Sequence, residues 1–263
     1  MSTHLPSLFI SHGPPTMVVD DLAANRRLKE IAEELPRPEA ILCISAHWIE
    51  QAPNLTAAAE PETIHDYMGF PAELYRLSYP APGAPGLAQR AAECLRATGI
   101  PARLDEVRGR DHGAWQTAML MYPEADVPLI QLSLGGDLDP RRHYDIGRAL
   151  APLSGEGILV MATGTAVHNL RAWRQHRHET PAWARAFDDW LAATIEAGDL
   201  DALLDWRDEA PESRMAHPSE EHFTPLFVAA GAGGFGAGNP GRALHRGFEY
   251  GSLSMASFAF DAG

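Results

Sequence analysis

Histidines stand at several points where an apolar run of the sequence ends. The run "LFIS" is followed by His12 and the run "ILCISA" by His47, and His168 comes a few residues after "GILVMATG". Neutral imidazole is the commonest protein ligand for transition metals, and two or three usually hold one ion. An imidazole near its ordinary pKa also exchanges protons near neutral pH. These positions therefore predict a metal site with acid–base chemistry beside it.

Two further stretches carry histidines in the same kind of setting. His112 lies in "RGRDHGAW", just before a helix-like segment, and "HPSEEHFTPLFVAAG" places His217 and His222 at the entrance to another. Any one of these histidines alone is better explained by a hydrogen bond that holds a loop. Taken together, their distribution is better explained by a mononuclear metal site with additional acid–base histidines.

The rest of the sequence predicts the elements that must position these side chains. Apolar runs bounded by turn residues predict strands at 5–11, 39–46, 54–59, 127–134, 157–164 and 252–260. Amphipathic stretches predict helices at 20–35, 83–99, 139–153 and 181–198. This alternation indicates a single α/β domain over residues 1–263, with a mostly parallel or mixed central sheet flanked by helices. Ligands of such sheets gather at the carboxyl ends of the strands, where we expect the metal.

Composition excludes several classes of function. The formal net charge is −14, with 35 acidic against 21 basic residues, and so a nucleic-acid or anionic-membrane surface is not expected. No stretch approaches the length of an apolar membrane span, and the N-terminus lacks a secretion signal. The two cysteines, Cys43 and Cys94, are too few for a disulfide framework. We therefore expect a cytoplasmic enzyme, with a homodimer left open as an alternative to a monomer.

Seven motifs, in their order and approximate spacing, resemble one enzyme family. They are "SHGPP", "SAHW", "IHDYMGFP", "DHGAW", "GTAVHNL", "HPSEEHFTPLFVAAGA" and "YGSLSMASF". The chain is similar over nearly its whole length to the DODA-type extradiol aromatic ring-opening dioxygenases, which belong to the LigB-like class III extradiol enzymes. One departure is visible, because the turn before His168 commonly reads Gly-Ser-Gly and here reads Ala162-Thr163-Gly164.

The resemblance implies a role for each matching histidine. By motif, His12, His47 and His222 correspond to the metal ligands. His168 corresponds to the acid–base histidine, and in metal-substituted relatives it lies close enough to count as a fourth ligand. His112 is similar to the histidine that faces the oxygen side of the metal.

The implied reaction opens a catechol ring beside its two hydroxyls and incorporates both atoms of O2. Ferrous iron would bind both catechol oxygens and O2, which leaves about three positions for the protein. Because iron oxygenases commonly use two histidines and a carboxylate, Glu221 beside His222 remains an alternative third ligand. Zinc lies above ferrous iron in the affinity order, and so we expect one divalent metal, zinc or iron, in protein as isolated.

Three more residues are candidates for substrate contact or for holding the ligands in their tautomers: His65, His217 and Tyr250. His217 ranks first among them, because Pro218 fixes the local direction of the chain. The expected substrate is a dihydroxyphenylalanine-like or simpler phenolic catechol.

Two other functions remain open at this point. A zinc-dependent hydrolase would use the same scaffold, although no carboxylate base is firmly placed beside the metal. A metal-stabilised binding protein without activity would not need acid–base partners such as His168 and His112.

Overall fold

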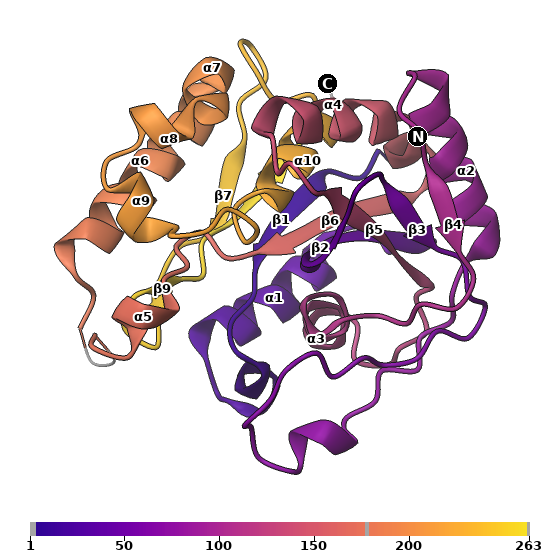
Figure 1. Cartoon of the computed structure of the whole chain (residues 1–263), viewed down its shortest axis with the longest axis horizontal. Coiled ribbons are helices and arrows are strands. Elements are labelled where there is room, and N and C mark those ends of the chain that lie inside the picture. The colour runs from indigo at the N-terminus through magenta and orange to yellow at the C-terminus, as the bar shows by residue number, and fades with distance from the viewer. Residues whose placement is uncertain (1–3, 177–178, 262–263) are drawn as a thin grey trace.

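The predicted strands form one mixed sheet at the centre of the molecule (Figure 1). A computed structural model describes residues 4–176 and 179–261 of the chain. Within these residues the sheet has eight strands in the order β4-β3-β5-β2-β6-β1-β10-β7. The strands are β1 (Ser7–Ser11), β2 (Ala40–Glu50), β3 (Asn54–Thr56), β4 (Arg103–Asp105), β5 (Leu129–Gly135), β6 (Ile158–Gly164), β7 (Arg242–His245) and β10 (Ser257–Phe260). Strands β5, β2, β6 and β1 are parallel. Strand β10 pairs antiparallel with β1, and β7 pairs antiparallel with β10.

The central strand β2 explains why the sequence around it is almost continuously apolar. Leu42 and Ile44 pack into the core on one face of the sheet, whereas Ile41 and Cys43 pack into the core on the other. A parallel strand covered by helices on both faces has no polar side. The run that precedes His47 is therefore dictated by burial, and His47 interrupts it.

Helices cover both faces of the sheet (Figure 1). The upper face in that view carries α2 (Pro85–Ala97), α4 (Pro140–Leu150) and α10 (Pro225–Ala232), whose buried residues share one core. The lower face carries α1 (Ala23–Glu34) and α3 (His112–Met121), which contribute to the other core. This arrangement confirms the predicted α/β class.

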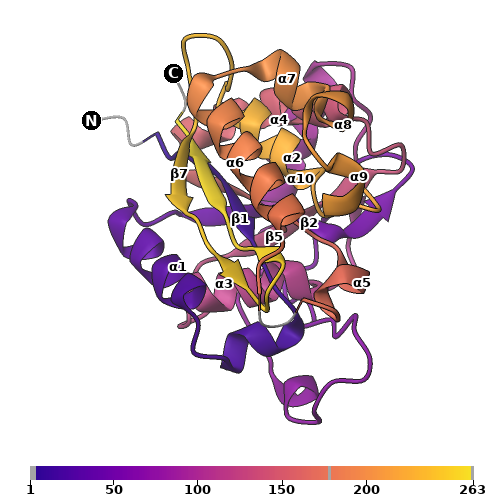
Figure 2. The same cartoon turned by 90° about the vertical axis from the view of Figure 1, so that its left-hand side faces the viewer.

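The remaining elements lie at the flank of the sheet and around its loops. Helix α6 (Ala182–Ala197) packs beside β7, and shorter helices follow it (Figure 2). These short helices are α5 (Leu170–Trp173), α7 (Leu200–Leu204), α8 (Trp206–Glu209) and α9 (Ser213–Ala216). Three 3-10 turns, η1 (Pro15–Val19), η2 (Leu74–Arg76) and η3 (Ala151–Glu156), and a ribbon of β8 (Phe248–Glu249) with β9 (Leu253–Ser254) complete the described elements.

One boundary differs from the sequence prediction in a way that matters for the site. Strand β2 continues through His47 to Glu50, and its pairing with β5 shifts register between Ile44 and Ile49. An irregularity of this kind bends a strand and redirects its side chains. His47 therefore lies within the distorted end of a strand and not beyond it. Among the described helices, none combines the length and apolarity that a membrane crossing requires.

Candidate metal centre

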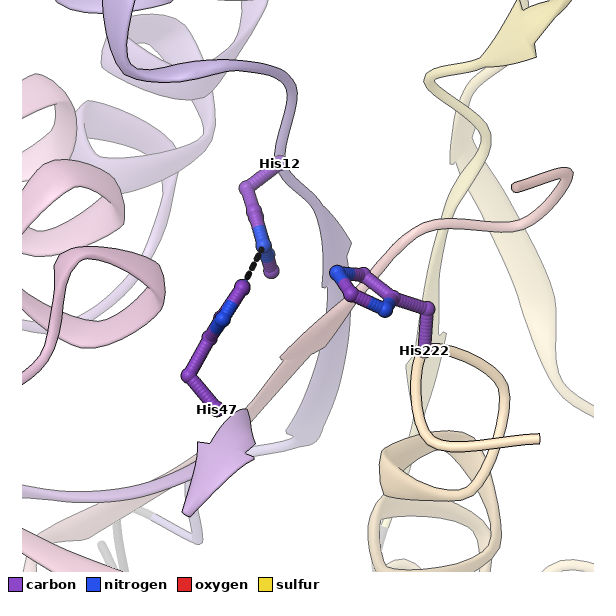
Figure 3. Close-up of side chains that lie close together, drawn as sticks. All are labelled: His12, His47 and His222. Atoms are coloured by element: carbon purple, nitrogen blue, oxygen red, sulfur yellow. Dashed lines mark hydrogen bonds between the residues drawn. The ribbon is translucent and has the colours of Figure 1, made fainter. Parts of the chain in front are cut away.

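Three adjacent parallel strands bring two histidines to one edge of the sheet. Strand β6 lies between β1 and β2, and all three run in the same direction. His12 directly follows β1, and its backbone N–H donates to the carbonyl of Gly164 at the end of β6, at 2.7 Å. His47 reaches the same edge from β2 (Figure 3).

The third histidine enters from a loop that is docked on β6. The His222 carbonyl accepts a hydrogen bond from the backbone N–H of Thr165 at 3.0 Å. A side chain at Gly164 would place its Cβ only 2.0 Å from that same carbonyl oxygen. The glycine therefore permits the close approach that carries His222 to the other two rings (Figure 3).

The three imidazoles converge on a common point. One ring nitrogen from each of His12, His47 and His222 lies within 4.8 Å of the other two. The Nε2 atoms of His12 and His47 are 3.1 Å apart. The structure thus brings together three histidines that the sequence predicted as ligands, from three separate segments of the chain.

A chain of hydroxyl groups fixes the tautomer of His12. The Thr117 hydroxyl donates to the Gly113 carbonyl at 2.9 Å, and it can therefore only accept from Thr163, whose Oγ1 is 3.1 Å away. With its proton used in that way, Thr163 Oγ1 must accept from Nδ1 of His12 at 2.9 Å. The proton of His12 is consequently on Nδ1, and the lone pair on Nε2 faces the other histidines.

Carboxylates lie beside Nδ1 of the other two rings. Asp66 Oδ2 is 3.4 Å from Nδ1 of His47, and Glu221 Oε1 is 3.2 Å from Nδ1 of His222. Burial raises the pKa of Asp66, but its hydrogen bonds and charge interactions with His112 outweigh this and lower it to about 2. Its negative charge, 3.4 Å from Nδ1 of His47, favours the tautomer that carries the proton on that nitrogen.

The resulting arrangement fits a bound cation. Two Nε2 lone pairs, on His12 and His47, face each other at 3.1 Å. A proton between them is disfavoured, because burial and the neighbouring histidines lower the pKa of both rings, that of His47 to about 4. Two nitrogens bound to one tetrahedral zinc ion would be roughly 3.3 Å apart. The residues present therefore match a divalent metal held by neutral imidazoles.

His168 and His112 flank this group on opposite sides. The His168 ring stacks on His222 with centroids 3.6 Å apart and planes at 11°. Burial lowers the pKa of His168 to about 4, against an opposing effect of Glu221, which favours a neutral ring. His112 begins α3, with its ring centroid 4.0 Å from that of His47. One ligand atom each from His168, Glu221 and His222 also lies within 4.8 Å of the others. The two alternative ligands, His168 and Glu221, are therefore close enough to share a metal with His222.

A cavity of about 210 Å³ opens onto the histidines. It is lined by His12, Gly13, Pro14, Pro15, His47, Tyr67, Phe70, His112, Thr165, His168, Leu170, Trp173, His222 and Leu253. A dry cavity of about 150 Å³ is large enough to bind benzene, and so this one accommodates a single aromatic ring. None of these lining residues is an Asp, Glu, Lys or Arg. The wall therefore offers mainly apolar and aromatic contacts to a ring of this size.

A second cavity, of about 460 Å³, shares His168 and Leu170 with the first. Its lining includes Arg171 and Glu221, which carry opposite charges. The two cavities therefore meet at the acid–base candidate His168, one apolar and the other bearing charges.

The three residues expected to contact a substrate lie outside the lining of the first cavity. His65 hydrogen-bonds the Leu77 carbonyl at 3.0 Å. His217 is fully buried against aromatic rings and donates from Nε2 to the Ala166 carbonyl at 2.9 Å. Tyr250 donates to Asp20. Direct substrate contact by these three side chains stays a prediction, and their contacts favour an indirect, supporting role.

The acidic residues behind the histidines were not among the residues predicted from the sequence. In "IHDYMGFP" the predicted site residue was His65, whereas the side chain that faces His47 and His112 is the adjacent Asp66. Buried Asp111 was also missed, although it caps α3 and accepts from Ser45 Oγ at 2.7 Å. An acidic residue beside a histidine within an expected pocket loop was the available signal for Asp66.

Comparison with known proteins gives consistent matches. Residues 1–260 match the family described as the catalytic LigB subunit of aromatic ring-opening dioxygenase. A 4,5-DOPA dioxygenase extradiol of Beta vulgaris is 40% identical, over 97% of this chain and 96% of its own length. One from Escherichia coli K12 is 40% identical, over 97% and 94%. A crystal structure of a protein from Escherichia coli K12 superposes with a TM-score of 0.80 at 34% identity, covering 97% of this chain and 99% of the other.

Proposed function

The chain belongs to the LigB family of aromatic ring-opening dioxygenases, and from this premise we propose that its substrate is dihydroxyphenylalanine or a closely similar catechol. The family consists of non-haem, metal-dependent extradiol enzymes, and the chain is accordingly an oxidoreductase that opens an aromatic ring with O2. This assignment replaces the two alternatives that the sequence left open, a zinc hydrolase and an inactive binding protein.

One observation carries the proposal at the level of this chain. Lone pairs of neutral histidines converge at the wall of a cavity that is sized for one aromatic ring. We propose His12, His47 and His222 as the ligands and ferrous iron as the active metal. The ion, when bound, would supply the Lewis-acid and one-electron chemistry that allows O2 to react with a catechol.

The acid–base work is proposed for His168. Its ring lines the cavity beside His222, and burial lowers its pKa to about 4, so that it is neutral before the substrate arrives. A neutral imidazole in this position would take a proton from a catechol hydroxyl and return it later in the reaction. His112 lines the same cavity from the start of α3, and it would hydrogen-bond an oxygen atom of the co-substrate.

The substituent on the ring is the second part of the substrate question. Curated relatives carry the name 4,5-DOPA dioxygenase, and an amino-acid side chain would bring a carboxylate and an ammonium group. The lining of the cavity around the histidines includes no Asp, Glu, Lys or Arg. The neighbouring cavity offers Arg171 and Glu221. We place the charged substituent on that side of His168.

Other expectations from the sequence stay predictions of this proposal. They are a single catalytic domain over residues 1–263, a cytoplasmic location, and either a monomer or a homodimer. Light scattering of purified protein would distinguish the two oligomeric states.

Oxygen uptake across a panel of catechols tests the proposal. Protein purified without O2 and reconstituted with ferrous iron should consume O2 with dihydroxyphenylalanine and 4-methylcatechol and form a yellow ring-opened semialdehyde. The zinc-loaded protein is the matched control and should consume none. Ester or amide hydrolysis by the zinc form, together with an iron form that leaves every catechol intact, would overturn the proposal.

A further inference from the structure

We infer that Asp66 is a positioning residue that sets the tautomer of His47 and ties it to His112. The inference deepens the proposed function, because it concerns how the chain prepares the proposed metal ligand His47. It rests on two contacts of the Asp66 carboxylate, a hydrogen bond from the backbone of His112 and a close charge contact with His47.

The two oxygens of Asp66 have separate partners. Oδ1 accepts from the backbone N–H of His112 at 2.8 Å and lies 3.0 Å from Nδ1 of the same residue. Oδ2 lies 3.4 Å from Nδ1 of His47. One carboxylate thus bridges the first residue of α3 and the distorted end of β2. The two imidazoles that it contacts have centroids only 4.0 Å apart.

The hydrogen bond from the His112 backbone determines which terminal atom of residue 66 faces His47. A backbone N–H can only donate, and the atom that faces it must therefore be an acceptor. With Oδ1 held in that position, the other terminal atom of residue 66 faces His47. In an aspartate this atom is an oxygen, whose negative charge 3.4 Å from Nδ1 favours a proton on that nitrogen and leaves the lone pair of Nε2 free. That Nε2 is the atom that lies 3.1 Å from Nε2 of His12.

An amide at this position would present a different atom to His47. In Asp66→Asn the amide oxygen must stay on the His112 N–H, so that the NH2 group faces His47. An NH2 group only donates and carries no negative charge, so that it would favour a lone pair on Nδ1 and a proton on Nε2. The variant would retain the size of the side chain and the anchor of the loop, while the His47 nitrogen that faces His12 would be blocked.

A merely structural Asp66 would behave differently. If its task were only to anchor the loop to α3, the amide would serve as well as the carboxylate, because the amide oxygen accepts from the same N–H. Asp66→Asn therefore separates positioning from anchoring.

The experiment measures zinc affinity by competition with a chelator, together with nitrogen NMR of the histidines in metal-free protein. Asp66→Asn should bind zinc about 10–100-fold more weakly, which is the usual effect of losing a partner of a metal-bound histidine. Its His47 should carry the proton on Nε2, in contrast to Nδ1 in the unaltered protein. Asp205→Asn makes the same chemical change in an exposed pair with Arg141 and should alter neither measurement.

Two results would overturn the inference. One is unchanged zinc affinity in Asp66→Asn, and the other is an Nδ1–H tautomer of His47 in that variant. If the asparagine variant fails to fold, Asp66→Ala with added formate decides, because formate should restore most of the lost zinc affinity and a loop anchor would not be rescued. Zinc affinity and tautomer are measured without a catechol, and so they stand or fall separately from the substrate proposal.

Discussion

At the scale of single residues, the centre is defined as much by the groups behind the imidazoles as by the imidazoles themselves. His12 presents a lone pair on Nε2 because a hydrogen-bond relay through Thr163 and Thr117 to a backbone carbonyl holds its proton on Nδ1. The histidines could be predicted from their positions at strand ends and in motifs. The relay could not, because it joins positions 151 and 46 residues apart, and sequence spacing does not reveal such contacts.

Removing the hydroxyl of Thr163 should therefore weaken metal binding without changing any ligand. Thr163→Val keeps the shape of the side chain but leaves Nδ1–H of buried His12 without an acceptor, or allows that proton to move to Nε2. We expect zinc affinity to fall about 10–100-fold. Thr163→Ser, which retains the hydroxyl, is the control and should bind zinc nearly as well as the unaltered protein. Equal affinity in the valine variant would show that the relay does not set the tautomer.

His222 and His168 should differ in what their loss removes. His222→Ala should lose metal and activity together, by at least the roughly 10–100-fold expected for an outer partner. His168→Ala should keep most of its metal and lose turnover by roughly 10²–10⁴-fold, the usual contribution of a proton-transfer group. Metal content measured beside turnover in both variants distinguishes these outcomes. Equal metal loss would make His168 a ligand, and full retention in His222→Ala would point to Glu221.

At the scale of elements, the order of strands brings the histidines together. The sequence predicts β1, β2 and β6 and the helices around them, because burial on both faces makes the strands apolar and the helices amphipathic. It does not predict that β6 lies between β1 and β2, nor that the loop before α10 docks on its end. Both depend on pairing between distant segments. The bend of β2 could not be predicted from the sequence either, since the strand contains no glycine or proline.

The docking of the His222 loop on β6 makes Gly164 the most sensitive position among these elements. A Cβ there would lie 2.0 Å from the His222 carbonyl oxygen and 3.0 Å from its carbon, and the backbone of the docked loop would have to move. We expect Gly164→Ala to cost about 1–3 kcal/mol of unfolding free energy and to lower zinc affinity.

Gly86, in the first turn of α2, is the matched control, because a Cβ there meets nothing within 4 Å. Gly86→Ala should leave zinc affinity unchanged and should be neutral or stabilising by up to about 1 kcal/mol. Urea unfolding and chelator competition measure both quantities. A Gly164→Ala variant as stable as Gly86→Ala would refute the tight docking.

At the scale of the whole molecule, buried histidines make the fold sensitive to acid. Burial is the main cause that lowers the pKa of His217, to about 3, while its ordinary value in an unfolded chain is near 6.5. Between these two values the unfolded chain binds a proton that the folded chain does not. The free energy of unfolding therefore decreases as the pH falls from about 6.5 towards 3, by up to about 1.4 kcal/mol per pH unit from this residue.

His217→Gln tests this sensitivity. A glutamine NH2 can replace Nε2 as donor to the Ala166 carbonyl, and it does not titrate. Urea unfolding of metal-free protein at a series of pH values should show a shallower loss of stability towards low pH in this variant. An unchanged slope would mean that His217 is protonated in the folded state as readily as in the unfolded chain.

The molecule as a whole carries a net charge of −14, while the cavity at its histidines has no Asp, Glu, Lys or Arg in its lining. The net charge alone predicts that nucleic acids are not partners, and this stays a prediction. The size and lining of the cavity required the structure, since they combine the ends of β1 and β2 with residues from several other segments, among them α3, α5 and β9.

Reaction under labelled oxygen tests the central claim most directly. The ferrous protein is mixed with dihydroxyphenylalanine under ¹⁸O2, and the product is trapped by reduction before its aldehyde exchanges oxygen with water. Extradiol cleavage predicts a ring-opened product whose mass includes both labelled atoms, absent from the zinc-loaded control. A product that keeps its ring, such as a quinone, or one that takes its new oxygen from water, would contradict the assignment.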